Sequence, residues 1–169
     1  MRRKSPPNAS EFQIATTWMV VPRGFFSREI VLVREGQVVA TLKLAMFKEA
    51  CEFTLSGHQF EIRRKSIWKD GFEFFCDGAS ICTVSHAFWS WSYEISATDQ
   101  AWTLQRAGFF SRRHQLLSGE QEVGTIQPTG WFTSKRIAHF ADNVPPPIQV
   151  LAIFVVLILA RREQQSAGS

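Results

Sequence analysis

The chain of 169 residues has little of what marks several large classes of protein. It contains only three cysteines, Cys51, Cys76 and Cys82, an odd number without the spacing of a zinc site or a disulfide framework. Cys51 and Cys82 fall in segments with strand periodicity, where we expect core residues. The first residues lack the apolar run of a secretory signal, so we expect a cytoplasmic protein.

The sequence also lacks the short motifs that many enzymes carry. No glycine-rich phosphate loop, H-E-x-x-H motif or nucleophile elbow is present. The four histidines are scattered and have no partner at metal-ligand spacing, and we interpret His114 as a histidine on a strand face. Asp70, Asp77 and Asp99 stand in turn-like contexts. We therefore expect a protein that is not an enzyme, with no catalytic residue, no cofactor and no metal.

What is present favours a single globular domain rich in β structure. The chain is 45% hydrophobic and 20% charged, which excludes a disordered tail. Its aromatic residues are 15 Phe, 6 Trp and one Tyr, a composition typical of strands. The net charge of +4 permits anionic lipid or nucleic acid as a partner and requires neither. We expect no nucleic-acid partner.

An internal repeat runs through the chain without a gap, and its period is the separation between Trp18 and Phe60. Apolar residues that coincide in the three copies include Trp18, Phe60 and Trp102, and then Leu32, Phe74 and Leu116. The pentapeptide Gly-Phe-Phe-Ser-Arg at 24–28 recurs unchanged at 108–112, two periods later. Three copies of one structural unit account for the whole pattern.

Each unit predicts about four short strands. Apolar residues recur at every second position, which is the strand period, and turn signals such as Asp77-Gly78 separate the runs. The expected strands lie near 17–21, 28–34, 37–43 and 50–55, and again one and two periods later. Because the period is an even number of positions, the inward-facing positions should keep their phase in every unit. A sheet of about twelve strands leaves exposed edges unless it closes, so we expect a mainly β fold, a closed antiparallel barrel.

A C-terminal apolar segment predicts a helix over about 146–161. Apart from Gln149, residues 148–160 are apolar all round, so the helix must be buried by protein or by lipid. Its apolar run is about 20 Å long, which matches the height of the strands better than a bilayer core of about 30 Å. We expect a central helix inside the barrel, because twelve strands enclose more space than their own side chains fill. A membrane anchor is the alternative.

The expected arrangement is a flexible leader over residues 1–15, one barrel domain over 16–162 and a flexible tail over 163–169. It resembles the Tubby C-terminal-like fold, which Tubby proteins, phospholipid scramblases and the plant LURP-one-related family share. The resemblance rests on the alternating strands from about Thr17 to Phe140 and on the apolar segment from Val144 to Arg162. Because Tubby proteins bind phosphoinositides on the barrel wall, it implies an anionic phospholipid as a ligand.

Basic residues beside aromatic residues are the candidate binding site. The basic residues are Arg63, Arg64 and Lys65 at the end of one expected strand, and Arg28, Arg112 and Arg113 after the repeated turn. The aromatic residues are Phe25, Phe26, Trp68, Phe109 and Phe110. At an anionic membrane, aromatic rings insert to the depth of the lipid headgroups and basic side chains contact the lipid phosphates. Each basic residue near the surface contributes about 1 kcal/mol to binding. Alternatively, the rings plug the barrel ends and the charges serve solubility.

The expected function is therefore binding of anionic phospholipid, at a membrane surface, or of an acidic partner. The alternative is an integral, scramblase-like protein that moves lipids and spans the membrane with residues 144–160. Scramblases place an acidic calcium-binding segment before their terminal helix. Here that stretch offers only Asp142 and Asn143, and a hard cation needs six or more oxygen ligands, so we do not expect calcium-driven scrambling.

Overall fold

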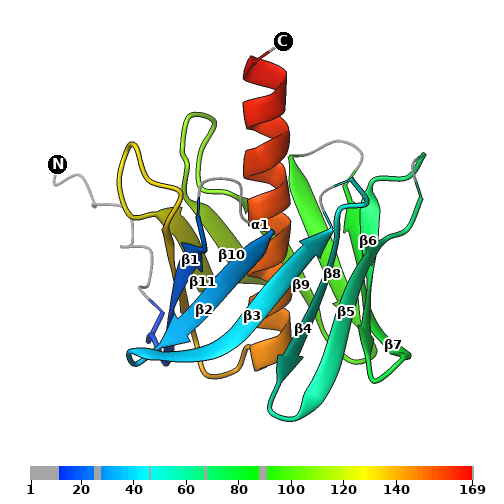
Figure 1. Cartoon of the computed structure of the whole chain (residues 1–169). Helices are drawn as coiled ribbons and strands as arrows, with labels where there is room; N and C mark the ends of the chain where they lie inside the picture. The colour runs from blue at the N-terminus through cyan, green and yellow to red at the C-terminus, as the bar shows by residue number, and fades with distance from the viewer. Residues whose placement is uncertain (1–11, 25–27, 46, 67, 88–90, 169) are drawn as a thin grey trace, which may run out of the picture.

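The structure is a computed structural model, and it describes residues 12–24, 28–45, 47–66, 68–87 and 91–168. Twelve strands follow one another along the chain, and one helix ends it (Figure 1). The strands are β1 (Thr16–Pro22), β2 (Glu29–Arg34), β3 (Gln37–Ala45), β4 (Ala50–Leu55), β5 (His58–Arg64), β6 (Gly71–Cys76), β7 (Ala79–His86), β8 (Ser92–Ala97), β9 (Ala101–Arg106), β10 (His114–Ser118), β11 (Gln121–Pro128) and β12 (Arg136–Phe140). The helix is α1 (Pro146–Ala167).

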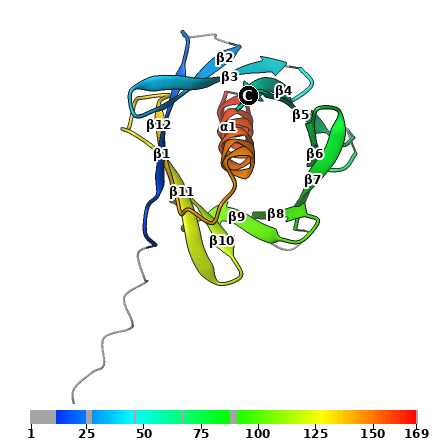
Figure 2. The ribbon, with the colours of Figure 1, turned by 90° about the horizontal axis from the view of Figure 1, so that it is seen from below.

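The strands form a closed antiparallel meander, as the sequence predicted. Each strand pairs with the next, and β1 pairs with β12, so the barrel has no free edge (Figure 2). The view along the axis shows α1 in the centre, surrounded by the strands. The ladder between β3 and β4 is the shortest of the twelve, with three residue pairs from Lys43↔Glu52 to Ala45↔Ala50.

The backbone reproduces the internal repeat of the sequence. The pairing register shifts after Leu32, Phe74 and Leu116, at the same place in each unit, and the extra residue of each β-bulge lies in the next strand, β3, β7 or β11. In each case one residue of the neighbouring strand is left without a register partner. Bulges of this kind bend and twist a strand, so their repetition gives each third of the barrel the same curvature.

The last strand departs from the repeat. The period of the sequence predicts that Ile137 faces inward, as Phe53 and Ile95 do. This prediction is wrong, because Ile137 is only half-buried. In its place Ala138 and Phe140 are fully buried against the core.

A slip of one residue in strand pairing accounts for the difference. In the second unit, Ile95 of β8 pairs with Trp102 of β9. The repeat therefore predicts that Ile137 of β12 pairs with Trp18 of β1. Instead, Trp18 pairs with Ala138, one position later. Successive side chains of a strand point to opposite faces, so a slip of one residue turns every side chain of β12 over. As a result, Arg136 faces the barrel interior and is 9% exposed.

The helix fills the barrel, as predicted. Its residues from Ile148 to Val156 are all buried, and the ring of Phe154 packs edge-on against Phe72 at 5.5 Å between centroids. The only polar residue of this stretch, Gln149, accepts a 2.6 Å hydrogen bond from the Trp18 indole nitrogen. Burial of each large apolar side chain stabilises a fold by about 1.5–3 kcal/mol, so the buried face of the helix contributes strongly to the stability of the core.

Both ends of the domain extend further than expected. The helix continues to Ala167, so residues 163–167, which we expected in a tail, are helical, in keeping with the good helix formers at 161–165. At the other end, Phe12 packs against the core and the Ala15 amide donates a 2.9 Å hydrogen bond to the Phe140 carbonyl. Within the described part of the chain, no helix combines the length and the hydropathy needed to cross a membrane.

Candidate functional site

The two ends of the barrel are built differently (Figure 1). Because the strands alternate in direction, the connections β1–β2, β3–β4, β5–β6, β7–β8, β9–β10 and β11–β12 all lie at one end, which we call the loop end. The other end, the turn end, carries the shorter turns and the connection from β12 to α1. The helix runs from the turn end to the loop end, where Arg162 contacts Glu49 and Asp70.

Exposed aromatic residues gather at the loop end. Among the residues that the structure describes, seven aromatic side chains are largely exposed, each by at least 78%. They are Phe47, Trp68, Trp91, Phe109, Phe110, Trp131 and Phe132. All seven lie in loop-end connections. The interpretation that the aromatic rings plug the barrel ends is wrong for Trp68, Phe109 and Phe110, because these side chains are exposed. Phe25 and Phe26, in the β1–β2 connection, lie outside the described residues.

Charge divides between the same two ends. In the described parts of the loop-end connections, eight residues are basic and two are acidic. The basic residues are Arg23, Arg28, Lys48, Lys65, Lys69, Arg112, Arg113 and Lys135, and the acidic residues are Glu49 and Asp70. The turn-end connections hold five acidic residues, Glu35, Asp77, Asp99, Glu120 and Asp142, and no basic residue. The barrel is therefore polarised along its axis.

Two neighbouring loops carry the densest part of this surface. The β9–β10 and β11–β12 connections are joined by a 3.0 Å hydrogen bond from the Arg112 guanidinium to the Trp131 carbonyl. The rings of Phe109 and Phe110 meet edge to face at 4.9 Å between centroids. A hollow of about 340 Å³ lies between the loops, with Phe110 and Trp131 in its wall. Neither connection contains a carboxylate side chain.

The predicted basic triplet does not act as one patch. Arg63 lies exposed on the outer wall, donates to Glu61 and stands 4.9 Å above the Phe75 ring. Arg64 faces the other way and forms an ion pair with Glu49 at 3.2 Å. Lys65 is exposed at the start of the β5–β6 loop.

The second predicted group is also divided. Arg113 lies on the outer wall and is paired with Glu122 at 2.7 Å. Arg28 and Arg112 lie in loop-end connections, where both are exposed. Within the described residues, Arg28, Lys65 and Arg112 have no carboxylate at ion-pair distance, whereas the other three predicted residues do. Of the six predicted cations, only these three are thus available at the loop end.

A polar network attaches the helix to the rim of the barrel. Arg162 of α1 donates to both carboxylate oxygens of Glu49, at 2.8 and 2.6 Å, and to Asp70 at 3.0 Å. The hydroxyl of Tyr93 donates to the other oxygen of Asp70 at 2.7 Å. The hydrogen bonds from Arg162 lower the pKa of Glu49. Burial acts to raise the pKa of Asp70, but the hydrogen bonds from Tyr93 and Arg162 outweigh it and lower that pKa. Both loop-end carboxylates are therefore engaged in holding the helix.

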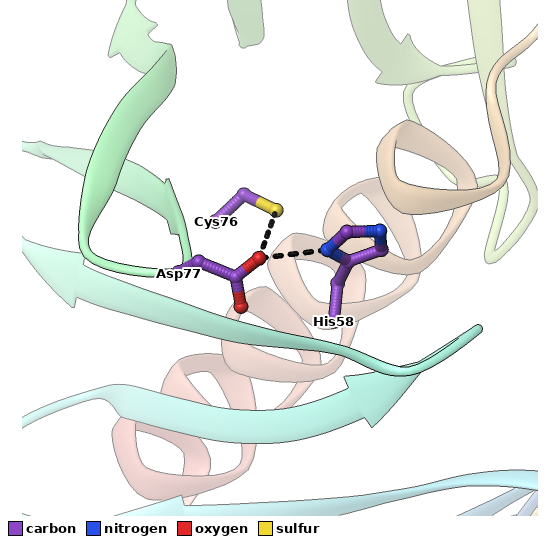
Figure 3. A group of neighbouring side chains, drawn as sticks. All are labelled: His58, Cys76 and Asp77. Carbon is purple, nitrogen blue, oxygen red and sulfur yellow. Dashed lines mark hydrogen bonds and ion pairs between the residues drawn. The ribbon is translucent and has the colours of Figure 1, made fainter.

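A separate cluster of possible metal ligands lies at the turn end (Figure 3). His58 Nδ1 is 2.7 Å from Asp77 Oδ2, and the Cys76 sulfur is 3.9 Å from the same oxygen. Asp77 also accepts a hydrogen bond from the Gln59 amide at 2.9 Å. Partial burial and the charge of Asp77 raise the pKa of the Cys76 thiol, which disfavours the thiolate that metals bind. The contacts fasten two neighbouring turns, which is a structural role.

The buried cysteines offer no reactive thiol. Burial raises the pKa of Cys82 to about 11 and that of Cys51 still further. Both side chains lie in the core, at 3% and 1% exposure. This agrees with their interpretation as core residues.

Sequence reasoning missed part of the loop-end surface. It singled out Trp68, Phe109 and Phe110 as exposed aromatic residues, but it missed four others: Phe47, Trp91, Trp131 and Phe132. The signal was available, because in a closed meander every second connection must lie at the same end of the barrel. No family model, curated protein or solved structure matches this chain.

Proposed function

We propose that this protein docks on the surface of an anionic membrane through the loop end of its barrel. One observation carries the proposal. Every largely exposed aromatic side chain of the described residues stands in the connections where basic residues outnumber acidic ones by eight to two. The resemblance to Tubby-like barrels suggested an anionic phospholipid as the ligand, and the loop end supplies a surface for one.

Aromatic and basic residues contribute different parts of the binding energy. A Phe or Trp side chain offers about 150–250 Å² of surface, and apolar area removed from water is worth about 25 cal/mol per Å². Lys and Arg near an anionic surface add about 1 kcal/mol each. Stable association with a membrane usually needs both kinds of contribution, and the loop end has both.

The polarity of the barrel favours one orientation on the membrane. Anionic lipid attracts the basic loop end and repels the acidic turn end, so the barrel axis turns its loops toward the bilayer before contact. The attraction reaches one Debye length, about 8 Å at physiological ionic strength. Docking should therefore weaken as salt is added.

The helix determines how the loops meet the surface. Its polar residues at 163–165 are exposed, and this end of the helix projects beyond the loops (Figure 1). Such residues do not enter hydrocarbon, so the barrel must tilt to bring rings into contact with lipid. The β9–β10 and β11–β12 loops are the side that we expect to make contact, because they carry four exposed rings and no carboxylate.

Docking of this kind requires neither catalysis nor a membrane-spanning helix. The apolar residues of α1 contact the barrel wall, and lipid has no access to them unless the barrel opens. An acidic protein would meet the same cations, but it would leave the seven exposed rings without a role. We therefore favour the membrane.

Sedimentation with vesicles tests the proposal. We expect the protein to bind vesicles of phosphatidylcholine with phosphatidylserine and not vesicles of phosphatidylcholine alone. Changing Trp131 and Phe132 together to Ala should weaken binding at least tenfold. The reason is that each lost ring removes more than the free energy that corresponds to a factor of ten, which is about 1.4 kcal/mol.

A matched control removes exposed apolar surface from elsewhere. Ile14 and Val38 are 52% and 59% exposed and lie near the turn end. Changing both to Ala should leave vesicle binding unaltered. The proposal is wrong if the unaltered protein ignores anionic vesicles, or if the two double variants bind equally well.

A further inference from the structure

Three basic side chains, from β9, β10 and β12, face the barrel interior at the loop end. In the ladders, Arg106 of β9 pairs with His114 of β10, and Arg136 of β12 pairs with Pro128 of β11. All three lie at strand ends next to the β9–β10 and β11–β12 loops. We call Arg106, His114 and Arg136 the inner cationic cluster.

Two members of the inner cationic cluster are buried and have nitrogen atoms without a hydrogen-bond partner among the described residues. His114 is 5% exposed, and neither of its ring nitrogens has a hydrogen-bond partner among the described residues. Arg136 is 9% exposed, its Nε has no partner, and no described carboxylate lies within ion-pair distance of its guanidinium. A buried guanidinium without a counter-charge is costly, so its presence calls for an explanation.

At the positions of His114 and Arg136 the other two units of the repeat place different residues, whereas the counterpart of Arg106 in the second unit is Arg64. The counterparts of His114 are Ile30 and Phe72, which are ordinary core residues. Arg136 faces inward only because β12 is shifted by one residue relative to the repeat. The burial of His114 and of Arg136 is therefore particular to this part of the barrel and does not follow from the architecture.

The arginine charges disfavour the protonated forms of their neighbours in the inner cationic cluster. Burial, followed by the charges of Arg106 and Arg136, lowers the pKa of His114 to about 4, while the Arg112 backbone acts weakly in the opposite direction. Burial and the charge of Arg112 lower the pKa of Arg136. Among the described residues, the only ion pair in the cluster joins Arg106 to Glu163 of the helix.

The cluster lies directly beneath the loops that we expect to meet the membrane. The hollow between these loops is lined by Arg112 and by Pro128, the register partner of Arg136. Arg136 does not line this hollow itself, but it is linked to it through Pro128 and through the charge of Arg112, which acts on Arg136.

We propose that the inner cationic cluster, together with Arg112, binds a phosphate monoester group. Such a group carries close to two negative charges and several acceptor oxygens, which suit the planar donor arrays of two guanidinium groups. It would supply the counter-charge that Arg136 lacks and an acceptor for His114. The proposal rests on the docking proposed above in one respect only: a lipid headgroup is one source of the phosphate monoester, and a soluble phosphate is the other.

A titration with soluble phosphates tests the site without a membrane. Inorganic phosphate and inositol hexakisphosphate are added separately to the full chain, and the side-chain NMR signals of Arg136 and His114 are followed. We expect saturable shifts of both signals and a higher pKa of His114 when phosphate is bound. If neither compound moves these signals at millimolar concentration, the site does not exist.

Two variants give the test its specificity. Arg136→Met removes the charge and should reduce affinity for inositol hexakisphosphate at least tenfold. His114→Phe introduces the residue that the second unit has at Phe72, so it should fold normally and reduce affinity severalfold. Arg63→Met, on the outer wall, is the matched control and should bind like the unaltered protein. Equal affinity of His114→Phe, Arg136→Met and the control would overturn the proposal.

Vesicles then separate the two sources of phosphate and the two proposals. If the ligand is a headgroup, vesicles with a phosphorylated phosphatidylinositol should bind more tightly than phosphatidylserine vesicles of equal charge, and Arg136→Met should remove the difference. If the site takes soluble phosphate, the two vesicle types bind equally while the titration saturates. Vesicle binding without any response to phosphate overturns the site alone, and phosphate binding without vesicle binding overturns the docking alone.

Discussion

Arg162 of the helix donates two hydrogen bonds to the carboxylate of Glu49, at 2.8 and 2.6 Å, across 113 positions of the chain. The same guanidinium reaches Asp70 in the next loop-end connection. This contact joins the end of the central helix to two loops of the barrel. It consequently determines how firmly the helix is held at the end that we expect to meet the membrane.

The free energy of unfolding should fall on acidification because of this network. The pKa values of Glu49 and Asp70 are lowered in the fold. Their ionised forms therefore stabilise the fold at pH values above the ordinary pKa of a carboxyl group. This contribution is lost as the pH falls below about 4.5 and through the lowered values. Arg162→Met should cost about 1.5–3 kcal/mol at neutral pH and flatten the acid dependence. Chemical denaturation at several pH values measures both effects, and an unchanged acid slope in the variant would contradict the role of Arg162.

The buried helix should not tolerate a charge. Val155 is fully buried in the centre of the barrel, and an aspartate there would have no partner. Val155→Asp should therefore destabilise the fold by several kcal/mol. Exposed Gln164 on the same helix offers a control, since Gln164→Asp should have little effect. A thermal melt of Val155→Asp that matches the unaltered protein would mean that the helix is not enclosed.

The basic residues at the end of β5 should separate into two kinds. Arg64 pairs with Glu49 in the rim network, so Arg64→Ala should lower the free energy of unfolding by about 1 kcal/mol. Arg63 forms an exposed pair with Glu61, and exposed pairs contribute little, so Arg63→Ala should leave stability within about 0.5 kcal/mol. Urea denaturation of the two variants makes the comparison. Equal losses would show that the inward position of Arg64 has no consequence.

The periodic parts of the chain made most of the fold predictable. Alternation at every second residue and the internal repeat indicated the strands, and the apolar circumference of 148–160 indicated the enclosed helix. Each of these is a property of the sequence that needs no knowledge of distant contacts. The turned-over side chains of β12 were not predictable, because the pairing of β12 with β1 determines its register and that contact joins the two ends of the chain.

The candidate site was less predictable than the fold. Arg28, Lys65 and Arg112 lie where the sequence suggested, beside loop-end aromatic residues. Arg64 was misjudged, because the pairing of β4 with β5 brings Glu49 to it and the helix then shares that carboxylate. The sequence alone does not show whether a charged residue will form an ion pair in the fold.

The most direct test of the account is to identify the end of the barrel that meets lipid. Amide signals are recorded by NMR on nanodiscs of phosphatidylcholine and phosphatidylserine, with and without spin-labelled lipid, which broadens nearby signals. We predict strong broadening at Gly130 and Trp131 in the β11–β12 loop and none at Gly78 and Gly119 of the turn end. Broadening at the turn end, or equal signals everywhere, would contradict the account.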